Sequence, residues 1–271
     1  LEDLPNEMIV GLNKRDPRIF DPYRLNLETG EMTMIAENPG NITGWMTDHN
    51  GKLRIAITTD GVNTSLMYRA TEKGAWTSVK TTNFKESLSP RFFTFDNKNL
   101  YATSNIGRDK EAVVIIDPTT GEEMEELYAN ETNDVSGISY SRKDKKLLSA
   151  MYTADKAERH FFDEDAKATY ERLIKELDGY EVAITSRTKE EDKHIIRTYS
   201  DRSLGAYYLY DEATDALTKL ADVSPWIDEA NMAAMTPVQY TSRDGLTIHG
   251  YLTLPKGLEN AKGIPVVVNV H

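Results

Sequence analysis

Serine is the residue type in this sequence that could act as a nucleophile in hydrolysis. The segment Gly137-Ile138-Ser139-Tyr140-Ser141 comes nearest to Gly-x-Ser-x-Gly, the sharp turn that presents a serine hydroxyl to a histidine base and an oxyanion hole. Its last residue is serine instead of glycine, and the segment lies where the sequence predicts a strand. We therefore interpret Ser139 as a structural residue of that strand.

Metal and thiol chemistry find little support in the sequence. The chain contains no cysteine, which removes thiolate nucleophiles, disulfides and cysteine-ligated zinc together. Adjacent carboxylates such as Glu122 to Glu126 point in divergent directions, which favours solvated charges over a paired acid and base. Four histidines are isolated and lack the spacing of metal ligands: His49, His160, His194 and His249. We expect no metal site and no cofactor.

The strands that carry these residues recur with a fixed period. Four polar turns are each followed by an apolar strand, and the first apolar residues of these strands are Leu53, Leu100, Leu147 and Ile195. Their spacings are 47, 47 and 48 residues. A constant period of a few dozen residues is typical of a repeat architecture.

A second set of turns follows the same repeat, with one member missing. These turns are Glu28-Thr29-Gly30, Glu72-Lys73-Gly74, Thr119-Thr120-Gly121 and Ala213-Thr214-Asp215. At the gap, apolar residues recur at helical spacing: Tyr170, Leu173, Ile174 and Leu177. Asp163 or Asp165 is suited to cap the start of this helix, and Gly179 its end.

Four strands in about 47 residues match a propeller blade, which must stack on neighbours to bury its faces. Met8 precedes Leu53 by 45 residues, so the first residues supply the later strands of a further blade. We predict an all-β fold, a β-propeller fragment of about four to five four-stranded blades with one helical insertion. A β-sandwich is the alternative, although sandwich strands do not normally repeat their turn chemistry at every fourth strand.

The repeat ends before the sequence does. Arg243-Asp244-Gly245 predicts a hairpin turn between two alternating strands, around Val238 to Tyr240 and Leu246 to Leu254. Ile264 to Val270 is a near-continuous apolar run, which suits a strand buried on both faces. These changes predict two domains, a partial propeller over residues 1–235 and the first strands of another, truncated domain over residues 236–271.

The stretch from Tyr240 to His271 resembles the junction in prolyl oligopeptidase family serine peptidases, especially the acylaminoacyl-peptidase-like branch. It carries Arg243-Asp244-Gly245, Gly250-Tyr251-Leu252 and Leu254-Pro255 directly after a propeller. Pro265 to Val268 match the strand before the family's His-Gly-Gly-Pro loop, of which only His271 is present. The resemblance implies that residues 236–271 open an α/β-hydrolase domain.

The resemblance also implies a function. The whole protein would be a serine peptidase that hydrolyses short peptides, with the propeller gating substrate access. The Ser-His-Asp triad would lie beyond His271, so we predict that this chain alone is inactive. His271 would begin the loop whose backbone amides bind the oxyanion.

Propeller loops in related peptidases can hold the terminus of a substrate with charged groups. The loop Arg15-Asp16-Pro17-Arg18 makes Arg15 and Arg18 candidate substrate-binding residues. The alternative is an exposed loop that only connects two strands.

A stand-alone propeller that binds a protein or ligand without catalysis is the competing function class. For the peptidase, the expected partners are peptide substrates, its own hydrolase domain and further copies of the open propeller. With 32 Lys and Arg against 44 Asp and Glu, a net charge of −12 argues against nucleic acid. The longest apolar run, Ile264 to Val268, is too short to span a membrane. Leu1 in place of Met, without a leader, indicates a processed chain or a piece, and the compartment, cytoplasm or periplasm, stays open.

Overall fold

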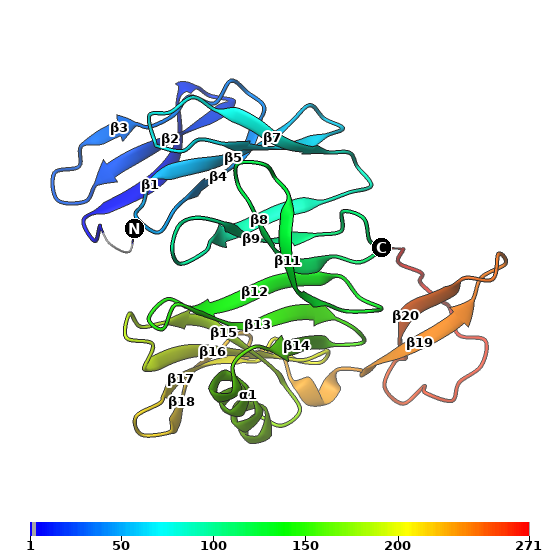
Figure 1. The fold of residues 1–271 in the computed structure, drawn as a ribbon. Helices are drawn as coiled ribbons and strands as arrows, with labels where there is room; N and C mark the ends of the chain where they lie inside the picture. The colour runs from blue at the N-terminus through cyan, green and yellow to red at the C-terminus, as the bar shows by residue number, and fades with distance from the viewer. Residues whose placement is uncertain (2–3, 271) are drawn as a thin grey trace. The chain divides into compact units, whose positions relative to one another are not determined.

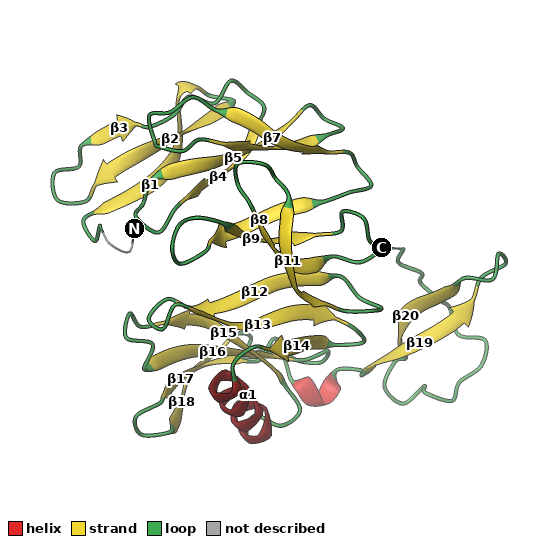
Figure 2. Ribbon diagram, in the orientation of Figure 1, coloured by secondary structure: helices red, strands yellow, loops and turns green. Residues whose placement is uncertain are grey.

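The computed structural model describes residues 1 and 4–270, and the chain divides into two compact units, residues 1–162 and 163–271. Regular structure in both units is almost entirely β (Figure 2). The predicted role of His271 concerns a residue that lies outside the described part of the chain.

The first unit contains four antiparallel sheets in which strands pair in chain order (Figure 1). The first sheet has β1 (Glu7–Asp16), β2 (Ile19–Asn26) and β3 (Met32–Met34). The second has β4 (Ile42–Thr47), β5 (Leu53–Thr59), β6 (Thr64–Tyr68) and β7 (Thr77–Thr82). The third has β8 (Leu88–Phe93), β9 (Leu100–Ser104), β10 (Ala112–Ile116) and β11 (Glu123–Ala129), and the fourth has β12 (Val135–Ser141), β13 (Lys146–Thr153) and β14 (Ala157–Phe161).

The second unit contains one four-stranded sheet, a helix and a separate hairpin. The helix α1 (Glu164–Glu176) precedes the sheet of β15 (Glu181–Arg187), β16 (Lys193–Tyr199), β17 (Ala206–Asp211) and β18 (Ala216–Asp222). A short 3-10 helix, η1 (Glu229–Asn231), leads to the two-stranded hairpin of β19 (Met235–Thr241) and β20 (Thr247–Thr253). Within the described residues, no helix has the length and apolar character needed to cross a membrane.

The repeat predicted from the sequence is confirmed. The four repeat anchors all fall in the second strand of a blade: Leu53 in β5, Leu100 in β9, Leu147 in β13 and Ile195 in β16. The first sheet supplies three strands of a further blade, as the position of Met8 predicts. The chain is therefore a β-propeller fragment whose described residues form five blades, two of them with three strands.

Apolar side chains between neighbouring sheets hold the blades of the first unit together. Ile55 and Leu66 of the second sheet pack in one buried cluster with Phe93, Leu100 and Val114 of the third. All five are at most 3% exposed. Burial of apolar surface contributes about 25 cal/mol per Å². A single blade would leave its apolar faces uncovered, so it gains this stabilisation only by packing against a neighbour.

Helix α1 fills the gap in the turn pattern and covers a sheet. Of the two predicted caps, Asp163 is the N-cap, because its carboxylate accepts a hydrogen bond from the Ala166 amide. Leu173 and Leu177 pack with Val182 and Ile196 in a buried cluster. The helix therefore buries one face of the sheet β15–β18 within the second unit.

The last segment both confirms and corrects the sequence prediction. The hairpin turn is present, and Gly245 has the positive φ of 88° that such a turn favours in glycine. The strand predicted over Ile264 to Val270 is wrong, because these residues have no regular structure. Val267 is 94% exposed. A strand buried on both faces needs neighbouring strands to pair with and packed layers that cover its faces, and this run has neither among the described residues.

Candidate functional site

Ser139 lies in β12, as the sequence predicts. Its hydroxyl oxygen is 2.7 Å from that of Ser149, the residue opposite it on β13. A hydroxyl on a sheet and bonded to another hydroxyl lacks the histidine that would activate it as a nucleophile. Ser139 is therefore a cross-strand contact.

The isolated histidines serve packing, His49 and His160 between neighbouring blades and His194 within one blade. His49 places Nε2 at 2.8 Å from the carbonyl oxygen of Phe93, and the ring of His160 stacks on Tyr128 with centroids 4.0 Å apart. His194 is buried, with Nε2 at 2.7 Å from a carboxylate oxygen of Glu212. In the described part of the chain, no three His, Cys, Asp or Glu residues are grouped so that they could hold a metal ion.

Arg15 stands at the end of β1 and is engaged by a buried carboxylate. Its Nε and Nη2 atoms each donate to Asp21 at 3.0 Å, and Asp21 is fully buried on β2. Nη2 also donates to the carbonyl oxygen of Asn38 at 2.7 Å. The hydrogen bond from Arg15 lowers the pKa of Asp21 below its ordinary value. The guanidinium therefore ties β2 to the connection that follows β3.

That connection, residues 37–41, is organised around Asn38. The Asn38 side chain accepts from the amides of Gly40 and Ile42 at 2.8 and 3.1 Å. It donates to the carbonyl oxygens of Phe20 and Ile42 at 3.3 and 2.9 Å. Asn38 is only 6% exposed, so this loop is held by buried hydrogen bonds.

Arg18 differs from Arg15, because its side chain is 85% exposed and pairs with Asp16 at 2.9 Å. The two predicted substrate-binding residues thus lie close together in the sequence, Arg15 in β1 and Arg18 in the β1–β2 connection, but face different surroundings. Arg15 has two of its nitrogens committed to Asp21, whereas Arg18 reaches solvent. Their role in binding a substrate stays a prediction.

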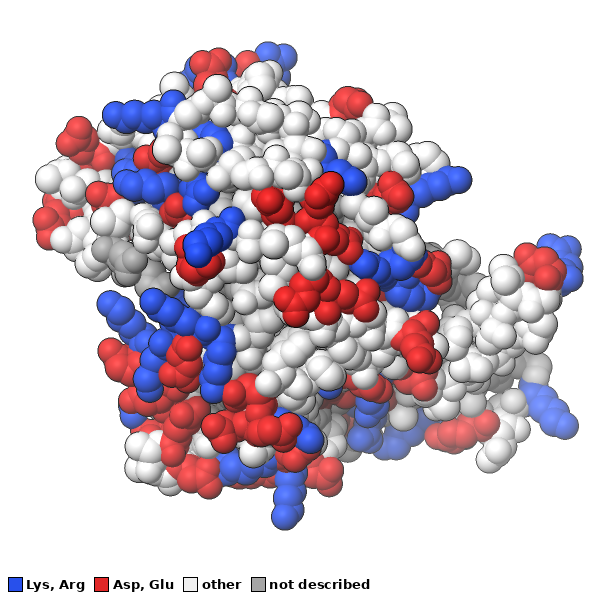
Figure 3. Space-filling model, in the orientation of Figure 1, with Lys and Arg blue, Asp and Glu red and all other residues white. Residues whose placement is uncertain are grey.

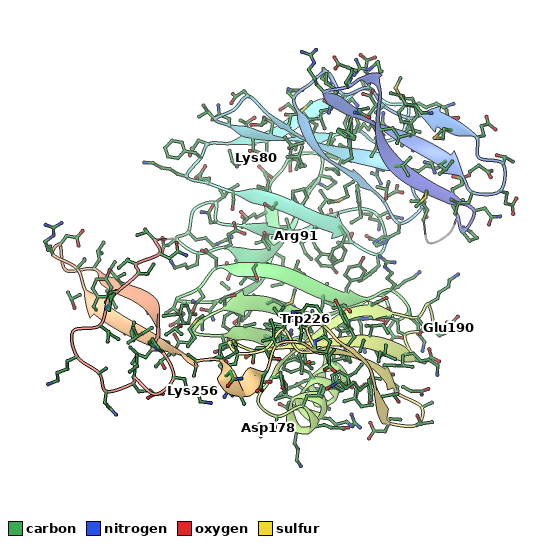
Figure 4. All side chains as sticks on the ribbon, turned by 180° about the vertical axis from the view of Figure 1, so that it is seen from behind. Lys80, Arg91, Asp178, Glu190, Trp226 and Lys256 are labelled. Carbon is green, nitrogen blue, oxygen red and sulfur yellow. The ribbon has the colours of Figure 1, made fainter. Side chains whose placement is uncertain are left out.

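The second unit has a polar pocket of about 280 Å³ beside the end of its sheet. Tyr180 donates to a Glu229 carboxylate oxygen at 2.6 Å across it, and this bond, followed by burial, raises the pKa of Tyr180. Lys219 and Asp222 pair at 2.6 Å on its other side. Trp226 lies on the segment between β18 and η1 and is 78% exposed (Figure 4). The last blade and the segment that leads into the hairpin therefore both contribute to the lining of this pocket.

The first unit has a larger pocket, of about 460 Å³, on the sheet β4–β7. Its lining includes Glu37 and Pro39 of the loop held by Asn38, together with Met67 and Trp76. Neither pocket could be predicted from the sequence. Tyr180 and Glu229 are 49 residues apart, and Glu37 precedes β4 whereas Trp76 precedes β7, so no local motif marks either set.

Acidic side chains gather over β11, the edge strand of its sheet (Figure 3). Arg108 lies 2.6 Å from Glu123 and 3.3 Å from Glu126. The acidic run therefore lies on an edge strand, where charged side chains oppose pairing with the edge of another sheet.

The fold of this chain, a β-propeller fragment with one helix, is similar to that of several peptidases of known structure. It matches a solved structure of prolyl endopeptidases with a TM-score of 0.59 and 14% identity, over 93% of this chain and 38% of that one. Prolyl oligopeptidase B from Galerina marginata matches with a TM-score of 0.59 and 15% identity, over 94% of this chain and 38% of that one. A puromycin hydrolase matches with a TM-score of 0.58 and 15% identity, over 87% and 38%.

Among curated proteins, the chain is similar to dipeptidyl aminopeptidase BIII from Pseudoxanthomonas mexicana. The two are 28% identical over 278 residues, which is 98% of this chain and 40% of that protein. The chain thus spans less than half the length of the curated relative it matches. No family model matches the chain. The resemblance to prolyl oligopeptidases predicted from the junction is confirmed by these matches.

Proposed function

We propose that this chain is the non-catalytic propeller portion of a serine peptidase that hydrolyses short peptides. One observation carries the proposal: similarity to a dipeptidyl aminopeptidase extends over 98% of this chain but over only 40% of that protein. The chain contains propeller blades. The segment most similar to a nucleophile motif contains Ser139, whose hydroxyl makes a cross-strand contact. Catalytic residues would then lie beyond His271.

The domain boundary near residue 235 belongs to the same proposal. Residues 1–235 form the partial propeller, and residues 236–271 begin the α/β-hydrolase domain. The separate sheet of β19 and β20 supports this boundary, since it shares no strand with the last blade. The exposed valines after β20 are accounted for in the same way, because the rest of the hydrolase sheet would cover them.

The propeller would act by limiting access to the active site. Its blades are rigid sheets joined by buried apolar side chains, which suits a cover that excludes folded proteins by size. Without its hydrolase domain, the open propeller would also associate with further copies through uncovered blade faces. Light scattering tests the second point, because a strictly monomeric chain would contradict it.

The experiment compares three proteins on short peptidyl chromogenic substrates: this chain, the full reading frame, and the full frame without residues 1–235. We expect no hydrolysis by this chain and hydrolysis by the full protein that a serine-directed fluorophosphonate abolishes. Removal of the propeller should extend cleavage to folded substrates. An inactive full protein would favour the stand-alone binding module, and unchanged size selectivity would refute gating.

A further inference from the structure

The pocket on the sheet β4–β7 has two walls that buried interactions fix in place. One wall is the loop of residues 37–41, which includes Glu37 and Pro39. Asn38 holds this loop through four side-chain hydrogen bonds, and Arg15 holds the Asn38 carbonyl oxygen at 2.7 Å. A ligand would therefore meet a preformed surface, and little ordering would be needed on binding.

A second part of the lining is aromatic and is also fixed in place. Trp76 rests on the guanidinium of Arg69, 4.3 Å from the ring centroid. Arg69 is itself 6% exposed and donates from Nε to the carbonyl oxygen of Leu53 at 2.8 Å. Trp45 lies against Trp76 with ring centroids 5.9 Å apart. The indole is thus supported from beneath and from the side, and Met67 lies with it in the pocket lining.

The rim of the pocket carries a negative charge that the protein compensates only in part. The Glu37 side chain is 61% exposed and lies 3.5 Å from Nη1 of Arg15. Arg15 already makes two 3.0 Å hydrogen bonds to the buried carboxylate of Asp21. One guanidinium therefore faces two carboxylates, so one negative charge is not neutralised by Arg15. Glu37, the exposed carboxylate of the two, can attract a cation to the pocket.

We propose that this pocket binds a peptide segment that carries an apolar side chain next to a basic one. The apolar side chain would lie against Trp76 and Met67, where burial supplies the affinity. The basic group would pair with Glu37 at the rim and supply the selectivity. A volume of about 460 Å³ falls in the range of small-ligand sites and accommodates a phenylalanine or leucine side chain.

This site lies wholly within the first unit and needs no catalytic domain, so it goes beyond the proposed peptidase function. Binding is measured on the chain itself, by calorimetry and tryptophan fluorescence. The probes are three blocked dipeptide amides: acetyl-Phe-Lys, acetyl-Phe-Glu and acetyl-Gly-Lys. We expect acetyl-Phe-Lys amide to bind about fivefold more tightly than acetyl-Phe-Glu amide, the effect of one partly exposed ion pair. Acetyl-Gly-Lys amide should bind most weakly, because it lacks the apolar side chain.

Two variants separate the contributions of charge and apolar surface. Glu37→Gln removes the charge at an exposed position and should abolish the preference for lysine over glutamate. Glu31→Gln is the matched control, an exposed carboxylate outside the pocket, and should leave the preference unchanged. Trp76→Ala should weaken binding of both phenylalanine peptides, whereas Trp226→Phe in the second unit should not.

The outcomes are decisive in either direction. Absence of saturable binding by acetyl-Phe-Lys amide at millimolar concentration would overturn the proposal. Equal affinities for the lysine and glutamate peptides, or a preference that survives Glu37→Gln, would overturn it as well. Because Glu37 is exposed, its variant keeps the fold, and this arm decides the question even if Trp76→Ala does not fold.

Discussion

Replacement of Asn38 by alanine should destabilise the first unit strongly, although Asn38 lies in a connection between blades. The substitution removes four hydrogen bonds between 2.8 and 3.3 Å and leaves backbone groups of Phe20, Gly40 and Ile42 without that partner. A typical hydrogen bond contributes about 1 kcal/mol net. Water can replace part of the loss at the loop surface, so we expect a decrease of about 2–4 kcal/mol in the free energy of unfolding.

Urea unfolding followed by tryptophan fluorescence measures this loss. Trp45 and Trp76 belong to the first unit and lie 5.9 Å apart, so their emission reports on the sheet next to the loop. With a denaturant slope of about 2 kcal/mol per M, the midpoint should fall by about 1–2 M. The slope itself should stay unchanged, because the same surface is exposed on unfolding.

Asn41→Ala is the matched control, since Asn41 is an exposed residue of the same loop. We expect that variant to stay within about 0.5 kcal/mol of the original chain. If Asn38→Ala and Asn41→Ala unfolded at the same urea concentration, the buried hydrogen bonds of Asn38 would not hold the loop. The loop would then not be a preformed part of the pocket lining either.

Three further predictions concern other parts of the molecule. Leu173→Ala should cost about 2–5 kcal/mol, measured by urea unfolding with circular dichroism, because Leu173 is fully buried between α1 and its sheet. Gly205→Ala should prevent soluble expression, since an added Cβ would lie 2.2 Å from the carbonyl oxygen of Thr198 at a φ of +67°. The hydrogen bond to Glu158 raises the pKa of Tyr152 from 10.0 to about 12. The contribution of this hydrogen bond to stability should therefore be fully present below pH 10 and be lost as the pH rises through about 12. In an ultraviolet titration of Glu158→Gln, the tyrosine that ionises near pH 12 in the original chain should ionise at a lower pH.

The sequence was sufficient to predict the blade repeat because its signal is local and recurs. Leu53 and Leu100 start strands directly after polar turns, and each is at most 1% exposed. The helix around Leu173 and the turn at Gly245 follow from spacing and backbone conformation in the same local way. Each of these features depends on residues only a few positions apart.

The candidate site could not be predicted in this way. Arg15 was marked by its charge, but the carboxylate of Asp21 that holds it is visible only once β1 and β2 pair. Glu37, before β4, and Trp76, before β7, line one pocket although they are far apart in the sequence, and no short pattern records this. The valine run was read as a strand because periodicity reports what a segment would form with partners, not whether partners are present.

The exposed run after β20 has a practical consequence for handling this polypeptide. Val266, Val267, Val268 and Val270 are 76%, 94%, 78% and 88% exposed, and no charge interrupts them. Short uncharged segments rich in β-branched residues are prone to form cross-β fibrils. Concentrated samples should therefore gel or form fibrils through this segment while the blades are still folded. Val267→Lys should prevent this aggregation.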